Sequence, residues 1–467
     1  MNQNLYALMQ SRLPADRGKP CFLLPDGRVV SYAMLEQGVG RAAALLRAKG
    51  VKPGDRVAAQ VEKSVGSVML YLATLQVGAI YAPLNTAYTD AELEYLIADL
   101  EPKLVIRDIR PFAGESHKYE PDLNIAPRVA NDIAAIIYTS GTTGRSKGAM
   151  LSHDNLASNA DALIQTWGYT SDDVLLHALP IFHVHGLFIS LHCALMTGSP
   201  MLWLDKFDDA AVLVALPRAT VMMGVPTYYT RLLANPGFTR DAAAHMRVFI
   251  SGSAPLLEST FAEFEARTGK RILERYGMSE AVIITSNPLN GERVAGSVGF
   301  PLPGVELRIA GGEIGGIELK GPSVFAGYWR NPEKTAEEFT TDGFFRTGDV
   351  GRQDADGRVW ITGRAKDLII SGGYNVYPKE IELVLDELPG VSESAVIGVP
   401  HRDFGEAVVA VVIGAGDEAA IITAAREKLA NFKAPKRVMF VEALPRNAMG
   451  KVQKNLLRAR YEHLFAQ

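Results

Sequence analysis

A glycine- and hydroxyl-rich stretch, YTSGTTGRSKG at residues 138–148, has the residue types of a phosphate-binding loop. Glycines allow sharp backbone turns, hydroxyls donate hydrogen bonds, and a lysine adds a positive charge. The spacing does not match a Walker A loop, which needs four residues between its first glycine and a Gly-Lys pair followed by Ser or Thr. The stretch therefore predicts phosphate binding by a different kind of loop, through Thr139, Ser140, Gly141, Thr142, Thr143, Gly144 and Lys147.

Five further short motifs follow it along the chain. SGSAP at 251–255 comes after an apolar run, and ERYGMSE at 274–280 combines an aromatic ring, a glycine, a hydroxyl and a carboxylate. FRTGD at 345–349 ends on a carboxylate after a tight turn, GRAKD occupies 363–367, and PRNAMGK at 445–451 presents a lysine after a glycine. Each motif alone is ordinary, because an Asp after Thr-Gly is usually a turn residue and a Gly-Lys pair is usually at the surface.

Taken together and in this order, the motifs resemble those of the adenylate-forming superfamily, which includes acyl-CoA synthetases, luciferases and the adenylation domains of peptide synthetases. The resemblance covers nearly the whole chain. It implies a reaction in two halves: a carboxylate attacks the α-phosphate of ATP to give an acyl-adenylate, and a thiol, usually of coenzyme A, then displaces AMP. ATP, Mg²⁺ and coenzyme A are therefore expected. Because the attack brings two anions together, cations and backbone donors must neutralise the developing charge.

The same resemblance implies a role for individual residues of the first half-reaction. Lys451 resembles the catalytic lysine, Glu280 matches the magnesium-binding glutamate with Thr139 beside it, and His183 corresponds to a gate residue near the acyl site. Ser279 stands where many members have threonine, so the hydroxyl is kept. The remaining predicted nucleotide contacts are Gly252, Ser253, Ala254, Glu274, Arg275, Tyr276, Gly277, Asp349 and Arg364.

A second group of residues is implied in thioester formation. SGGYNVY at 371–377 resembles the loop that faces the active site in that half, and Gly372 and Gly373 would let the thin pantetheine arm pass close to the backbone. Lys366 lies at the position of the hinge about which the small domain of the superfamily rotates. Phosphates of coenzyme A are assigned to the basic C-terminal part, at Arg402, Lys433 and Lys436.

The acid substrate is expected to contact the middle third. LPIFHVHGLF at 179–188, GVPTYYTR at 224–231 and the SGSAP motif resemble malonyl-CoA synthetases. A dicarboxylate needs a cation for its second carboxylate, because a buried unpaired charge is costly, and arginine can hold a carboxylate through two parallel hydrogen bonds. Arg231 is predicted for this role, with Ser253 and His185 beside it and Arg247 as the spare cation.

Three alternatives to a malonate–CoA ligase remain open from the sequence. The first is an acyl-CoA synthetase for another short acid, such as methylmalonate, acetate or a short fatty acid. The second is a stand-alone adenylation domain that loads a carrier protein. The third is a non-catalytic acyl-nucleotide binder, against which the intact Lys451 and Glu280 argue.

The elements that must position these residues follow an α/β pattern. Strand-like runs at 56–61, 78–83, 104–106 and 133–138 alternate with helix-like runs at 67–76 and 92–100, which favours largely parallel sheets. Residues 109–130 contain three prolines and mixed charge and are expected to be an irregular surface connection. Further helices are expected near 257–267 and from Pro378, the latter ending at Pro389-Gly390.

The predicted fold is a large N-terminal adenylate-forming domain, residues 1–364, with two α/β sheet subdomains and a distorted β-barrel. A small mobile C-terminal α/β domain is expected over residues 365–467. Residues 174–204 contain no Asp, Glu, Lys or Arg, but their four histidines and two prolines favour a buried element over a membrane span.

Composition excludes several classes of protein. A net charge of -4 gives no reason to expect a polyanion partner, and two cysteines, Cys21 and Cys193, argue against a disulfide framework. Residues 426–460 carry ten Lys or Arg against two Glu, which fits a solvated face, a nucleic-acid patch or a site for a polyphosphorylated small molecule. Sparse aromatics there disfavour base stacking. We expect small-molecule substrates, no nucleic acid or membrane partner, a monomer or weak homodimer, and a cytoplasmic location.

Overall fold

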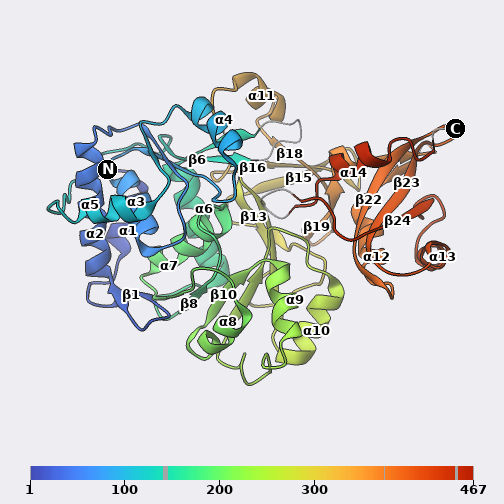
Figure 1. The fold of residues 1–467 in the computed structure, drawn as a ribbon, viewed down its shortest axis with the longest axis horizontal. Helices are drawn as coiled ribbons and strands as arrows, with labels where there is room; N and C mark the ends of the chain where they lie inside the picture. Colours follow the sequence, from blue (N-terminus) through green and yellow to red (C-terminus); the bar gives the residue numbers. More distant parts are fainter. Residues whose placement is uncertain (1, 140–145, 373, 447–450, 466–467) are drawn as a thin grey trace. The chain divides into compact units, whose positions relative to one another are not determined.

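The computed structural model describes residues 2–139, 146–372, 374–446 and 451–465 (Figure 1). The chain forms two compact units: unit 1 comprises Met1–Glu306 and Leu319–Phe345, and unit 2 comprises Leu307–Glu318 and Arg346–Gln467. The predicted boundary at residues 364 and 365 falls inside unit 2 and stays a prediction about where the small domain begins.

The first sheet of unit 1 has six strands and carries both ends of the predicted phosphate loop. Its inner strands β3, β4 and β6 are parallel and buried on both faces, as parallel sheets covered by helices usually are. Antiparallel β7 returns from β6, so Thr139 and Lys147 face each other in register across the loop ends. The strand order is β17 (Gly327–Tyr328), β7 (Lys147–Ser152), β6 (Ile133–Thr139), β4 (Ile80–Pro83), β3 (Arg56–Ala59) and β5 (Leu104–Ile106).

The second sheet of unit 1 has nine strands. Its parallel members β8, β10, β11 and β12 end at one edge, the edge outside which open α/β sheets bind ligands. The order is β14 (Phe300–Pro301), β13 (Val282–Ser286), β12 (Leu273–Met278), β11 (Val248–Ser251), β10 (Val221–Gly224), β8 (Leu175–His177), β9 (Met201–Trp203), β1 (Pro20–Leu23) and β2 (Val29–Ser31).

Helices of unit 1 pack on these sheets, and several begin where the sequence supplies a capping side chain. Thr89 and Glu92 form a reciprocal capping box at α4, and Ser152 and Asn155 form one at α6. The helices are α1 (Leu5–Arg12), α2 (Tyr32–Ala48), α3 (Val65–Gln76), α4 (Asp90–Leu100), α5 (Ile109–Ser116), α6 (His153–Trp167), η1 (His185–Ser190), α7 (Leu191–Thr197), α8 (Asp209–Ala215), η2 (Leu216–Arg218), α9 (Pro226–Ala234), α10 (Glu258–Thr268) and α11 (Pro332–Glu338).

Two further sheets complete the chain. The expected distorted barrel corresponds to a four-stranded sheet of β15 (Glu306–Ala310), β16 (Gly315–Lys320), β18 (Phe345–Gln353) and β19 (Val359–Arg364). The C-terminal sheet joins β21 (Tyr374–Val376), β20 (Ile369–Ser371), β23 (Gly405–Gly414) and β22 (Val391–His401), with β24 (Arg437–Val441) beside β23.

Alternating residues of β22 and β23 build one apolar cluster on each face of the C-terminal sheet, as a period of two requires. On one face, Val396 and Val408 belong to a cluster with residues of α12 (Pro378–Leu385) and α13 (Glu418–Lys428). On the other face, Ile397 and Val409 belong to a cluster that includes Leu457 of α14 (Lys454–Tyr461). The helix that follows Lys451 is therefore held to the sheet.

The predicted mixed α/β fold with a large N-terminal and a small C-terminal part is confirmed. Two local predictions are wrong. Residues 109–116 form α5, because Asp108 caps the helix and Ile109 and Phe112 turn inward, and Pro111 lies in the first turn where its missing N–H is tolerated. Helix α12 ends at Leu385, not at Pro389. The charge-free segment 174–204 folds as buried β8, η1, α7 and β9.

Candidate functional site

The ends of the predicted phosphate loop lie on neighbouring strands. Thr139 ends β6, Lys147 begins β7, and the Thr139 hydroxyl donates to the Lys147 carbonyl at 3.5 Å. Burial lowers the pKa of Lys147, and the positive charge of Lys334 lowers it further. A nearby anion, such as a phosphate, would favour the charged form of this lysine. The predicted loop residues Ser140, Gly141, Thr142, Thr143 and Gly144 lie outside the described residues.

Glu280 lies in the tight turn between β12 and β13 and is only 7% exposed. Its Oε1 accepts a hydrogen bond from the Tyr328 hydroxyl at 3.1 Å, and the Tyr328 ring lies 5.2 Å from the Lys147 ammonium. The structure thus brings the predicted metal carboxylate and the predicted phosphate lysine to one tyrosine.

Glycine is required at Gly277, because a Cβ there would lie 2.0 Å from the Val282 carbonyl oxygen. A Cβ on Gly252, after β11, would lie 2.4 Å from Cζ of Arg275, so the guanidinium would have to shift. Tyr276 on β12 and Ser279 in the turn that follows it are half-buried. The Glu274 side chain has a structural role, because its Oε1 accepts the Leu256 amide at 3.1 Å and so anchors the end of the SGSAP segment.

Arg275, which the sequence analysis assigned to the nucleotide, is a charged residue buried inside unit 1. The residue is 4% exposed, and its Nε and Nη2 atoms have no hydrogen-bond partner among the described residues. Burial lowers the pKa of its guanidinium to about 9. A buried cation without a carboxylate is costly, so this site is built for an anion that the protein alone does not supply.

His185 and Ser253 lie beside this cation. His185 is 2% exposed, its Nδ1 lies 3.3 Å from the Ser253 hydroxyl, and its Nε2 has no partner in the described part of the chain. Burial lowers the pKa of His185 well below its usual value, with the Arg275 charge next in importance, so the ring is neutral. The His185 amide donates to Nδ1 of His183 at 3.2 Å, which places the predicted gate residue next to it.

A π-helix sets the position of His185. The segment η1 begins at His185, and π-helical turns are rare and often found at functional sites. Gly186 is required there, because a Cβ would lie 2.1 Å from the Pro180 carbonyl oxygen. The Gly186 carbonyl in turn lies 3.0 Å from Nε2 of His177, at the end of β8.

The predicted acid-binding Arg231 lies on α9 and is far more exposed than Arg275. Its side chain is 54% exposed, forms an ion pair with Asp209 at 3.4 Å and lies 4.7 Å from the Phe207 ring. Its role stays a prediction. The spare candidate Arg247 instead forms a bidentate pair with Asp173, at 2.9 and 2.8 Å, and its Nη1 donates to the Trp167 carbonyl at 2.8 Å.

Unit 2 carries the predicted ribose-binding pair. Asp349 on β18 and Arg364 on β19 stand opposite each other in register, and Nε of Arg364 lies 2.6 Å from Oδ1 of Asp349. Asp349 is 3% exposed, and its backbone amide donates a hydrogen bond to the Thr347 hydroxyl oxygen at 3.0 Å. The carboxylate is thus held in place at the end of the strand pair.

Lys451 lies exposed in unit 2, after residues that fall outside the described part. Partial desolvation lowers the pKa of Lys366, and the charges of Arg364, Arg458 and Lys451 lower it further, while Asp367 opposes them. The predicted catalytic lysine and the predicted hinge therefore belong to one cationic cluster.

The predicted coenzyme A residues are spread over the surface of unit 2. Gly372 is exposed with φ +59°, Arg402 is exposed, and Lys433 forms an ion pair with Glu380 at 2.5 Å. Lys436 lies 5.3 Å from the Phe404 ring. Gly373 lies outside the described residues, and the role of the set stays a prediction.

The donor set fits magnesium better than a protein-caged metal. Among the described residues, no group of three or more His, Cys, Asp or Glu side chains could hold a metal ion. Mg²⁺ usually binds one or two carboxylates together with substrate phosphates, so a single buried Glu280 suits it. None of the described helices is long and apolar enough to cross a membrane.

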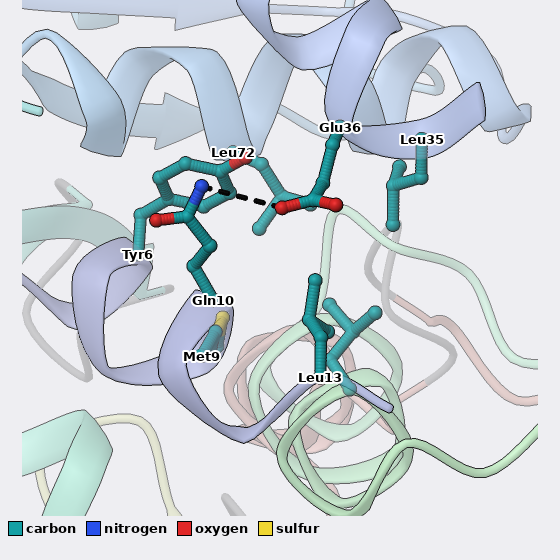
Figure 2. Close-up of a pocket in the computed structure, with 8 residues that line it drawn as sticks. Tyr6, Met9, Gln10, Leu13, Leu35, Glu36 and Leu72 are labelled. Atoms are coloured by element: carbon teal, nitrogen blue, oxygen red, sulfur yellow. Dashed lines mark hydrogen bonds between the residues drawn. The ribbon is translucent and has the colours of Figure 1, made fainter. Parts of the chain in front are cut away.

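A small pocket elsewhere contains none of the predicted site residues. It lies among α1, α2 and α3, where Gln10 Nε2 donates to Oε1 of Glu36 at 3.3 Å (Figure 2). Its walls are mainly apolar, with Met9, Leu35 and Leu72 among them, and nothing in it converges on a substrate.

Comparisons with known proteins agree with this arrangement. Residues 10–329 match the AMP-binding enzyme family, and residues 380–451 match the AMP-binding enzyme C-terminal domain. The malonate–CoA ligase of Arabidopsis thaliana is 37% identical over 481 residues, covering 89% of this chain and 79% of that protein. A feruloyl-CoA synthase of Amycolatopsis sp is 36% identical over 469 residues, which cover 93% of this chain and 94% of that protein.

A solved structure is similar over the full length. ATP-bound MatB from Rhodopseudomonas palustris is 51% identical, covers 100% of both chains and has a TM-score of 0.96. The chain belongs to the AMP-binding enzyme family. It is an AMP-forming acid–CoA ligase, which confirms the predicted class of enzyme and its use of ATP and coenzyme A.

Proposed function

We propose that this enzyme is a malonate–CoA ligase, which converts malonate, ATP and coenzyme A into malonyl-CoA, AMP and pyrophosphate. The buried guanidinium of Arg275, unpaired by any described carboxylate, carries the proposal. Malonate has two carboxylates, and only one can attack ATP. The other must enter the protein with its charge, and a preformed buried cation offsets the cost of removing that charge from water.

The neighbours of Arg275 suit a carboxylate. The Ser253 hydroxyl can donate a hydrogen bond, and neutral His185 keeps one ring N–H to donate while adding no second charge. Arg231 is also assigned to the acid, and release from Asp209 would free its guanidinium for that role. This division revises the sequence prediction, which gave the acid to Arg231 and Arg275 to the nucleotide.

In the first half-reaction, the free carboxylate oxygen of malonate attacks the α-phosphorus of ATP, and the bond from that phosphorus to the bridging oxygen breaks to release pyrophosphate. Lys147 and the loop after Thr139 are assigned to the leaving phosphates, and Lys451 to the attacking carboxylate and the α-phosphate. Glu280, with Thr139, would hold Mg²⁺, which supplies charge neutralisation for the phosphate oxygens. Tyr276 is assigned to adenine, and Asp349 with Arg364 to the ribose.

In the second half-reaction, the thiol of coenzyme A attacks the acyl carbon of malonyl-adenylate and AMP leaves. Gly372 and Gly373 are assigned to the pantetheine arm, and Arg402 and Lys433 to the phosphates of coenzyme A. Lys366 is assigned as the hinge between the two halves. We further propose that the enzyme acts in the cytoplasm as a monomer or weak homodimer, without nucleic-acid or membrane partners, which size-exclusion chromatography and cell fractionation test.

Substitution of the buried cation tests the proposal. Arg275→Met keeps an unbranched apolar stem and removes the charge, so kcat/KM for malonate should fall at least a hundredfold while acetate is used as well as before or better. Arg231→Ala should weaken malonate use by a smaller factor, because its site is more exposed. Arg267→Met, at a surface i,i+4 pair with Glu263, is the matched control.

Equal losses for malonate and acetate in Arg275→Met would contradict the proposal, since they would mean that Arg275 supports the fold or the nucleotide. The variant has a second readout. Removing an uncompensated buried charge should leave the melting temperature unchanged or raise it, and the stabilisation of the wild type by malonate should be lost.

A further inference from the structure

A short segment links the two predicted triphosphate groups, and none of the assignments above uses it. We call residues 325–330 the strap. Backbone hydrogen bonds join it to both groups: the Phe325 amide donates to the Glu280 carbonyl at 2.8 Å, and the Trp329 amide donates to the Gly148 carbonyl at 2.7 Å. Gly148 directly follows Lys147. The strap therefore fixes the backbone of the predicted metal ligand relative to the strand of the predicted phosphate lysine.

The Tyr328 side chain also links the side chains of Glu280 and Lys147. Its hydroxyl donates to Oε1 of Glu280 at 3.1 Å, and its ring lies 5.2 Å from the Lys147 ammonium. Tyrosine suits both contacts, because its hydroxyl donates to a carboxylate while its ring face attracts a cation. A carboxylate has two oxygens and about four lone-pair sites, so this hydrogen bond leaves capacity for a metal ion.

The surroundings hold Tyr328 firmly. The residue is 7% exposed, pairs with Ala149 on β7, and its amide donates to the Thr335 hydroxyl at 2.9 Å. Phe325 packs against its ring edge-to-face, with centroids 4.9 Å apart. The ring therefore has a fixed orientation, which a residue that sets the geometry of others requires.

The far end of the strap is also anchored. The Trp329 indole donates to the Asp99 carbonyl at 3.1 Å, and the Tyr138 hydroxyl donates to Oδ2 of Asp99 at 2.6 Å. Tyr138 directly precedes Thr139, the last described residue before the loop. In α4 (Asp90–Leu100), Tyr95 donates to the Ser146 carbonyl at 3.2 Å, on the other side of that loop.

We propose that Tyr328 is a positioning residue, which aligns the Glu280 carboxylate and the Lys147 ammonium for the magnesium-bound triphosphate of ATP. The proposal rests on the proposed function, because it takes the ATP roles of Glu280 and Lys147 from it. Since Tyr328 has two separate contacts, two substitutions separate their effects.

The test uses the full chain with ATP, with and without Mg²⁺. Tyr328→Phe removes only the hydroxyl, so the free Mg²⁺ that gives half-maximal malonate-dependent ATP–pyrophosphate exchange should rise about tenfold, while kcat at saturating Mg²⁺ changes little. The rise in melting temperature caused by ATP with Mg²⁺ should shrink, whereas the rise caused by ATP with a chelator should not.

Tyr328→Leu also removes the ring beneath Lys147, so ATP without Mg²⁺ should stabilise it less, and KM for ATP should rise about threefold. Tyr32→Phe is the matched control, because the Tyr32 hydroxyl is buried and donates to the Ser199 carbonyl at 2.9 Å, away from any assigned residue. Its Mg²⁺ dependence should equal that of the wild type.

A wild-type Mg²⁺ curve and wild-type thermal shift in Tyr328→Phe would overturn the proposal, as would an identical change in Tyr32→Phe. If Tyr328→Leu does not fold, Tyr328→Phe still decides, because it keeps the ring. The thermal arm needs no acid. A wild type that ATP and Mg²⁺ stabilise but that does not use malonate would refute the proposed function and leave this inference testable.

Discussion

Two residues beside the candidate site adopt backbone conformations that their side chains disfavour. Ser253 has φ +71° and Val282 has φ +56°, the left-handed region that β-branched residues such as valine rarely occupy. Ser253 faces His185, and Val282 closes the turn that presents Glu280. Such strain persists only where the surrounding structure enforces it, and it clusters at functional sites. This backbone strain could not be predicted from any residue pattern in the sequence.

Paired substitutions of Ser253 separate strain from chemistry. Ser253→Ala and Ser253→Gly both remove the hydroxyl, so each should lower kcat/KM for malonate by about tenfold. Only glycine relieves the positive φ, so Ser253→Gly should be more stable than Ser253→Ala by about 1 kcal/mol, as thermal or denaturant unfolding would measure. Full malonate activity in Ser253→Ala would remove Ser253 from the acid pocket.

At the scale of elements, α14 ties the lysine-bearing segment to its unit. Arg458 pairs with Asp367 of η3 (Ala365–Asp367) at 2.6 Å, and Lys454 pairs with buried Glu382 of α12 at 2.6 Å. Both pairs follow Lys451 in the chain and hold the helix that begins three residues later. The first pair also joins this helix to the residue after the predicted hinge.

We predict that Arg458→Gln slows malonate-dependent ATP–pyrophosphate exchange about tenfold, because Lys451 loses its fixed position. Thioester formation from supplied malonyl-adenylate should change less than about threefold. Arg460→Gln, on the exposed side of the same helix, is the control. Equal slowing of both halves would mean that the pair only supports the fold.

Asp386, at the C-terminal end of α12, makes the stability of unit 2 depend on pH. Burial raises the pKa of its carboxyl to about 6, although hydrogen bonds from Ser394 and the charge of Lys379 oppose the shift. A raised pKa disfavours the charged form in the folded state. Stability from this group is therefore full below about pH 4 and is lost as the pH rises through 6.

Asp386→Asn removes that charge, so it should stabilise the enzyme by roughly 2–3 kcal/mol at pH 7.5 and by about half as much at pH 5. Melting temperatures of variant and wild type across this range test the prediction. A constant difference at all pH values would show that the carboxyl does not titrate as inferred.

The sequence predicts elements well where one signal dominates. The strands near 56–61 and 104–106, the helix near 257–267 and the order of the motifs all follow from periodicity, stop signals and spacing. It fails where tertiary contacts decide: α5 forms in a proline-containing segment, and η1 depends on the close approach of Gly186 to Pro180. The burial of Arg275 was missed for the same reason, since a motif does not show which side of a strand is enclosed.

At the scale of the whole molecule, the assigned residues divide between the two units. Unit 1 holds the phosphate, metal and acid groups, whereas unit 2 holds Asp349, Arg364, Lys366 and Lys451. The rotation of the small domain about Lys366, which the resemblance to the superfamily implies, stays a prediction.

Lys451→Ala tests this division of labour. Malonate-dependent ATP–pyrophosphate exchange should fall at least a hundredfold, because the cation that neutralises the attack is lost. Conversion of supplied malonyl-adenylate and coenzyme A to malonyl-CoA should stay within a few-fold of the wild-type rate. Loss of both activities would show that the two halves share Lys451.

The central claim is that a buried cation selects malonate. The most direct measurement is coenzyme-A-dependent formation of AMP from ATP and Mg²⁺ by the unmodified enzyme, with malonate, methylmalonate, succinate, acetate, butyrate and octanoate compared at equal concentrations. We predict that malonate is used at least a hundredfold more efficiently than the three monocarboxylates. A monocarboxylate in first place would contradict the account of Arg275 and the acid pocket.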